Sequence, residues 1–305
     1  MEKDTVKSGS EERGARRGSV RPVIIGSAIA AVLGTVGAVI YYIAYITSYE
    51  ADIMHYRAGS REIIAAGCLI GGAVVAALAA AIASRKTAAR EQLPVKGDGG
   101  LFFSLFTALM FAAYVVSTIV SNKGLPTGAL EIATLAAAVV AAAAMILRTS
   151  RVGTGASGVI LSLFPMAHSA LLIFVYYFDL SSAPINSPEK GLTNVLLSIS
   201  LLLFMSDSRD RLGRISPVLA VFTRITAAFV LGPAAAARIA LRFTAGLSHP
   251  PFIVNVLLFS VALYGAYQLA LTVKKMREPL PPEPAGTEEE DKEAAGPAAG
   301  PDKED

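Results

Sequence analysis

The stretch VIIGSAIAAVLGTVGAVIYYIAYIT, residues 23–47, contains no charged side chain. An α-helix rises about 1.5 Å per residue, so about 20 apolar residues cross the roughly 30 Å hydrocarbon core of a bilayer. The run exceeds the apolar core of a signal peptide, and no small-x-small cleavage pattern follows it. We therefore predict a retained transmembrane helix over these residues.

Seven further apolar runs have the same character. With the first, the predicted spans are 23–47, 62–83, 101–121, 128–147, 157–178, 192–206, 216–237 and 252–273. The sixth run is short, and we expect its helix to include residues from the preceding loop. These runs are rich in Ala and Leu and lack the period-two alternation of barrel strands. The predicted fold class is an all-α integral membrane bundle of about eight transmembrane helices.

The distribution of charge predicts the orientation of this bundle. Twenty of the 27 Lys and Arg residues fall in the N-terminal arm, the loops after the second, fourth and sixth spans, and the C-terminal tail. The opposite side carries Arg57, Arg61, Lys123, Lys190, Arg238 and Arg242. Because positively charged loops stay in the cytoplasm, both termini are predicted to be cytoplasmic in a multi-pass protein of the cell membrane.

Both ends of the chain differ in composition from the apolar runs. Residues 1–22 form a basic arm and residues 278–305 an acidic tail rich in Pro, Gly and Glu. Such segments bury too little apolar surface to order a chain, so both are predicted to be disordered, flanking a membrane domain at 23–277. The basic arm is interpreted as a topology signal, so the expected partner is the lipid bilayer and not nucleic acid.

The motifs of common enzymes are absent from the sequence. It contains no GxxxxGK[ST], HExxH, CxxC or GxSxG pattern, and its three histidines are far apart. We therefore predict neither a metal nor a cofactor, and no catalytic residues. Gly67 and Gly71 form a GxxxG pattern that suits helix packing within the chain or between chains, which leaves the oligomeric state open.

Two polar residues stand out inside the predicted spans. Arg224 lies in VFTRITAAFVL, where a cation is costly by a few kcal/mol, so it is a candidate ligand-binding residue or a link between helices. His168 follows Pro165 in LFPMAHSALL and is a second candidate, with a packed, hydrogen-bonded histidine as the alternative.

The loop between the fifth and sixth spans, YYFDLSSAPINSPEKG at 176–191, is unusually rich in turn-forming residues. Pro184 restricts the backbone, while Asp179 and Asn186 can bond to neighbouring backbone groups. Ser187 and Pro188 have the pattern of a helix N-terminus. The segment, including Lys190, is predicted to be a rigid structural corner or a contact for a partner.

The same segment, with the RLGR sequence at 211–214, resembles uncharacterised multi-pass membrane proteins of clostridia-type Gram-positive bacteria. The similarity covers approximately residues 157–240 and implies a bacterial membrane protein. The sequence differs from that pattern at SDSRD, residues 206–210. The resemblance implies no activity.

Three hypotheses on function follow from these observations. The first is a non-enzymatic membrane component that acts through a membrane or envelope protein partner, as the missing catalytic motifs and the rigid corner indicate. The second is a transporter or carrier of a small solute, with an anion as one candidate, which eight helices and Arg224 indicate. The third, an intramembrane enzyme, lacks a convergent set of catalytic residues. A carrier should have a polar cavity that reaches Arg224, with interrupted helices near it, whereas a partner protein should form a tight, dry bundle with its polar residues outside.

Overall fold

The computed structural model describes residues 20–50, 52–85, 98–148, 155–178, 187–211, 216–247 and 250–277. Within these ranges, eight helical spans are long and apolar enough to cross a membrane, which confirms the predicted all-α bundle. The helices are α2 (Arg21–Ser48), α3 (Arg61–Ala83), α5 (Asp98–Ser121), α6 (Ala129–Leu147), α7 (Gly155–Phe178), α8 (Pro188–Arg211), α9 (Pro217–Thr226), the π-helical η2 (Ala227–Leu231), α10 (Gly232–Thr244) and α11 (Phe252–Arg277). Residues 1–19 and 278–305, and with them most of the predicted arm and the whole tail, lie outside the described part.

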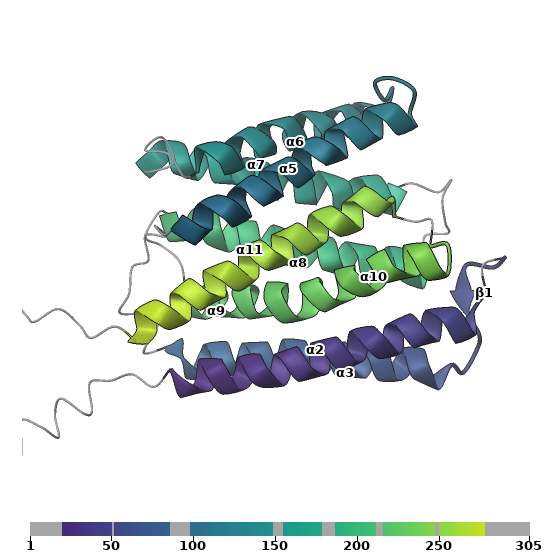
Figure 1. Ribbon diagram of the computed structural model, residues 1–305, viewed down its shortest axis with the longest axis horizontal. Coiled ribbons are helices and arrows are strands. Elements are labelled where there is room, and N and C mark those ends of the chain that lie inside the picture. The colour runs from purple at the N-terminus through teal and green to yellow at the C-terminus, as the bar shows by residue number, and fades with distance from the viewer. Residues whose placement is uncertain are drawn as a thin grey trace, which may run out of the picture.

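The two ends of the bundle are easily told apart. A short antiparallel hairpin, β1 (Tyr49–Glu50) and β2 (His55–Tyr56), follows α2 at one end, called here the hairpin end. At the other end, called the tail end, α2 begins and α11 finishes (Figure 1).

The helices form three groups across the bundle. Helices α2 and α3 lie together at one side, α5, α6 and α7 lie at the other, and α8, α9–α10 and α11 lie between them (Figure 1). Within the most apolar 18 residues of each span, 56–67% of the residues are buried in the central spans, against 22–33% in the outer spans. Large apolar side chains such as Val32, Phe102 and Val120 are exposed on the outer helices. The central helices therefore form the core, and the outer surface is suited to lipid.

Glycine allows α2 to approach its neighbours closely. A Cβ at Gly26 would lie 2.2 Å from the Ala80 Cβ, and one at Gly37 would lie 3.0 Å from Ile70 Cγ1. Gly67 and Gly71 of the GxxxG pattern differ, because a Cβ at either would meet nothing within 4 Å. Close packing of small residues thus joins α2 to α3, as expected where the hydrophobic effect does not drive helices together.

The seventh span is not a uniform α-helix. It runs from Pro217 to Thr244, but at η2 the Gly232 N–H donates to the carbonyl of Ala227, five residues earlier. Pro233 follows directly and has no N–H to donate to the carbonyl of Phe229. A proline of this kind accounts for a local π-helical turn.

Several predicted span boundaries change in the structure, and the changes at the sixth and seventh spans bring charged residues into helices. The sixth span begins at Pro188, as anticipated from its short apolar core, and the Ser187 carbonyl accepts the Gly191 N–H at 3.1 Å. The predicted end of the seventh span at residue 237 is wrong, because α10 continues to Thr244. Arg238 and Arg242, which the charge pattern placed in a loop, therefore both lie in the helix, and Arg238 is fully buried.

Candidate functional site

Several charged side chains of the central helices are buried inside the bundle. Among the described residues, five charged side chains are buried: Glu189, Lys190, Asp207, Arg224 and Arg238. All five belong to α8, α9 or α10. Charges in a membrane span are costly unless they are paired or functional, so these residues define the candidate site.

At the hairpin end, four residues form what is called here the hairpin-end cluster: Tyr41, Tyr56, Glu189 and Arg238. The Glu189 carboxylate accepts hydrogen bonds from the Tyr41 hydroxyl at 2.7 Å and from the Tyr56 hydroxyl at 2.6 Å. Arg238 Nη2 lies 3.4 Å from Glu189 Oε2, and both side chains are almost completely buried. One carboxylate from the first turn of α8 thus links α2, the hairpin and α10.

Burial and the neighbouring Glu189 carboxylate raise the pKa of the Tyr56 hydroxyl far above its usual range. Tyr56 therefore remains protonated at any physiological pH and keeps donating to Glu189. Tyr45 and Tyr49 stack beside it, with ring centroids 4.4 Å apart. Tyrosines at the ends of membrane spans commonly lie at the membrane–water interface, but Tyr41 and Tyr56 turn inward and bind an acid.

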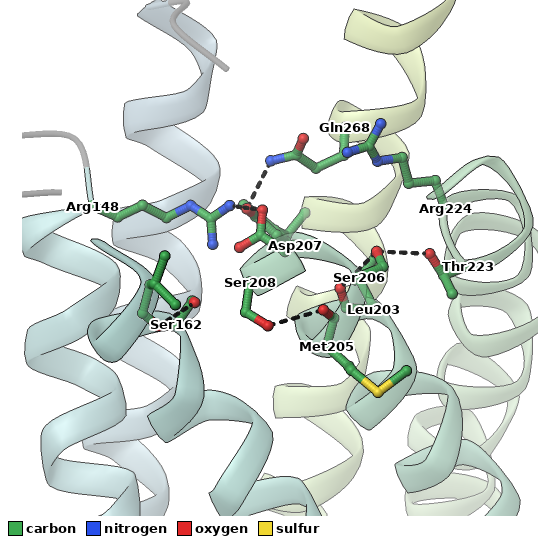
Figure 2. Close-up of polar contacts among 12 residues, drawn as sticks. Arg148, Ser162, Leu203, Met205, Ser206, Asp207, Ser208, Thr223, Arg224 and Gln268 are labelled. Atoms are coloured by element: carbon green, nitrogen blue, oxygen red, sulfur yellow. Dashed lines mark hydrogen bonds and ion pairs between the residues drawn. The ribbon is translucent and has the colours of Figure 1, made fainter. Parts of the chain in front are cut away.

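At the tail end, a second set is called here the tail-end cluster: Arg148, Asp207, Arg224, Tyr264, Gln268 and Thr272. Arg148 Nη2 donates to Asp207 Oδ1, and its guanidinium lies over the Tyr264 ring, 4.8 Å from the centroid. Gln268 Nε2 donates to the Tyr264 hydroxyl at 2.7 Å. Figure 2 shows Arg148, Asp207, Gln268 and Arg224 of this set as a row across the bundle.

Arg224 extends this row toward α9. Its Nη1 donates to Thr272 Oγ1 at 2.6 Å, and Thr272 Oγ1 donates to the Gln268 carbonyl at 2.8 Å. Figure 2 places the Arg224 guanidinium beside Gln268, whose Oε1 is buried with no hydrogen-bond partner among the described residues. A cation and an unfilled acceptor therefore lie close together inside the bundle, an arrangement that can bind a small polar molecule.

His168 lies in an aromatic environment on α7. Its ring makes edge-to-face contacts with Phe111 and Tyr114 of α5, at centroid distances of 5.1 and 5.0 Å. Its Nε2 is buried without a hydrogen-bond partner in the described ranges. Phe111 packs on Phe204, and Phe204 on Tyr264, so aromatic contacts connect His168 with the tail-end cluster. The structure therefore places His168 beside Arg224's cluster but not in it.

The predicted corner between α7 and α8 is described only at its end. Asp179, Pro184 and Asn186 lie outside the described residues. Lys190 is buried in the first turn of α8, directly after Glu189, and the Ser187 hydroxyl lies 3.4 Å from the Met54 carbonyl of the hairpin. The corner thus leads straight into the hairpin-end cluster.

Sequence reasoning missed most members of both clusters. Glu189, Asp207, Arg148 and Arg238 all lie near span ends, where a charge is ordinarily solvated. One available signal is that the sixth span is bounded by acids at both ends, in SPEKG and SDSRD. Within the described residues, no three His, Cys, Asp or Glu side chains converge as metal ligands.

Comparison with known proteins adds no relative to this description. No family model matches the chain, and neither a curated protein nor a solved structure is significantly similar to it.

Proposed function

We propose that this polytopic membrane protein is a carrier of a small anionic solute. The observation that carries the proposal is that charged and polar side chains collect on the buried faces of the three central helices. Ionisable residues inside a membrane span commonly mark a solute or ion pathway. Burying them costs free energy, and apolar residues would pack the helices together without this cost.

The interruption of the seventh span also supports a carrier. η2 separates α9, which carries Arg224, from α10, which carries Arg238. Broken helices near the bilayer midplane are a recurrent feature of solute sites in transporters, since they free backbone groups and permit local motion. Gln268, one helical turn from the Arg224 partner Thr272, adds a buried acceptor beside the cation.

The anionic class follows from the basic side chains. Arg224, Arg238 and Lys190 are each at most 1% exposed. A guanidinium in a low-dielectric interior attracts carboxylates and phosphates strongly and can bind them with two parallel hydrogen bonds. Arg224 is the residue we assign to the solute, with Gln268 as the neighbouring acceptor for a solute hydroxyl or amine.

The alternative, a component that acts through a protein partner, has less support. It requires polar contact residues on the outside of the bundle, whereas the buried charges described here face inward. Of the corner residues that suggested a partner contact, Asp179, Pro184 and Asn186 lie outside the described part of the chain, and Lys190 is buried. In the proposed setting the protein lies in the cell membrane with its tail end toward the cytoplasm, as the Lys and Arg distribution predicts.

Purified protein in liposomes tests this function. Vesicles are incubated with a metabolite extract of the host cells, and the anions that accumulate inside are identified by mass spectrometry. Hydrogen bonds to charged groups contribute about 1.5–3 kcal/mol. Arg224→Gln is therefore expected to lower accumulation by at least about tenfold at limiting solute concentration.

The control is Arg242→Gln, which removes an exposed arginine from the same span and should leave accumulation unchanged. Arg224→Lys, which keeps the charge but loses the planar fork, should give an intermediate value. The proposal fails if wild-type vesicles accumulate no anion beyond the level of empty vesicles, or if the Arg224→Gln protein is folded and fully active.

A further inference from the structure

Helix α8 carries an acid of each cluster at its two ends. Glu189 lies in its first turn and Asp207 near its last, and no charged residue occurs between Lys190 and Asp207. At about 1.5 Å per residue the two carboxylates are separated by roughly 27 Å along the helix, close to the thickness of the hydrocarbon core. The two ion pairs therefore lie near the opposite boundaries of the membrane-spanning region.

The two acids are joined to different helices. Glu189 binds Tyr41 of α2, Tyr56 of the hairpin and Arg238 of α10. Asp207 binds Arg148, which follows α6, and this arginine lies over Tyr264 of α11. Helix α8 is thus attached to α2 and α10 at the hairpin end, and to α6 and α11 at the tail end. Because the two attachments share no residue, either one can break while the other stays intact.

The seventh span is divided between the same two ends. The Arg224 side of the span, α9, bonds to α11 and to α8 through Thr223 and Ser206, whose hydroxyls are 3.0 Å apart. The Arg238 side, α10, bonds to Glu189. Because η2 lies between them, one half can shift by absorbing the change in backbone angles at the π-helical turn.

Ion pairs are physically suited to closing an entrance. The attraction between two buried charges is largely offset by the cost of removing both from water. When an entrance opens and water enters, both charges are rehydrated, so opening requires less free energy than exposing a comparable apolar contact. Both pairs are closed in this structure, which is the arrangement expected of a carrier sealed at both ends.

Building on the carrier function proposed above, we propose that the Glu189–Arg238 and Arg148–Asp207 ion pairs are its two gates and that they open alternately. Opening at Glu189 releases α8 from α2, the hairpin and α10. Opening at Asp207 releases α8 from Arg148 while the hairpin end stays closed. The central segment of α8, which contains Ser200, is then reached by water from one face at a time.

Site-directed thiol labelling tests the gates without knowledge of the solute. Cys68 is the only cysteine, so Cys68→Ser gives a cysteine-free protein into which Ser200→Cys places one buried probe. Labelling by a membrane-impermeant maleimide is measured in intact cells and in inverted vesicles, with a C-terminal tag reporting which face is the tail end. Glu189→Gln is expected to raise the labelling rate from the hairpin face by about tenfold, equivalent to about 1.4 kcal/mol in the opening equilibrium. Asp207→Asn should do so from the tail face.

Glu50→Gln is the matched control, because Glu50 makes an exposed ion pair with Arg57 at the same hairpin end and should not change labelling. If Glu189→Gln or Asp207→Asn does not fold, Tyr56→Phe and Arg148→Lys weaken the same contacts more mildly. Equal acceleration from both faces, or no acceleration by either folded variant, overturns the gates. Side-specific labelling does not depend on uptake, so a failure of the carrier function itself would appear separately, in the metabolite accumulation experiment.

Discussion

Replacing Arg238 with methionine is expected to destabilise the bundle by about 3–5 kcal/mol, because it leaves the Glu189 carboxylate buried without its cation. Methionine retains much of the length and apolar volume of arginine. The lost stability therefore comes mainly from removing the positive charge and not from opening a cavity. The measurement is the thermal unfolding of the purified protein in detergent. Size-exclusion chromatography accompanies it, to show that the variant remains monodisperse before heating.

Arg242→Met in the next turn of α10 is the control for this variant. Arg242 is exposed and donates to the Leu247 carbonyl at 3.0 Å, so its loss should cost no more than about 1 kcal/mol. The double variant Arg238→Met, Glu189→Gln should recover most of the lost stability, since it removes both charges of the pair and leaves an amide that can still bond to the Tyr41 and Tyr56 hydroxyls. A double variant as unstable as the single one would show that the pair is not the source of the effect.

Gly34→Val is expected to be the most damaging change on α2. A Cβ at this position would lie 1.8 Å from the Phe229 carbonyl oxygen and 2.9 Å from its carbon. Both are backbone atoms of η2, so the clash can be relieved only by moving α2 away from the seventh span. Overpacking of this kind typically costs about 1–3 kcal/mol, and a contact with backbone places this variant at the upper end of that range.

Gly71→Val on α3 separates packing from helix propensity. Both substitutions place the same β-branched residue inside an apolar helix, but a Cβ at Gly71 meets nothing within 4 Å. The Gly34→Val protein should therefore be less stable than the Gly71→Val protein by most of the overpacking free energy expected for Gly34→Val, and thermal unfolding of both variants measures this difference. Equal melting temperatures would mean that α2 and η2 are not in the close contact seen in the structure.

The contact at Gly34 also explains how the seventh span tolerates Pro233. Proline cannot donate to the Phe229 carbonyl, and the absence of a side chain at Gly34 lets the Cα of α2 approach that oxygen directly. A Cα–H group can form a weak hydrogen bond to such a carbonyl. The interruption between the two proposed gates is thus accommodated by a glycine almost two hundred residues earlier in the chain.

The amino-acid sequence alone determined the membrane class, the eight spans and the start of α8 at Pro188. These features depend on local composition and length, because each helix satisfies its own backbone and needs about 20 apolar residues to cross the bilayer. The roles of Asp179, Pro184 and Asn186 in a structural corner or partner contact remain predictions. His168 is buried in the core, and its role as a ligand-binding residue also remains a prediction.

Only the tertiary structure decided which charges face inward. Arg238, Glu189, Asp207 and Arg148 all lie near span ends, where sequence cannot distinguish a solvated charge from a buried one. Their partners are distant in the chain: Tyr41 donates to a carboxylate at residue 189, and Arg148 to one at residue 207. Burial of a charge depends on the helices that surround it, and that arrangement follows from packing between helices, not from the hydropathy of any one of them.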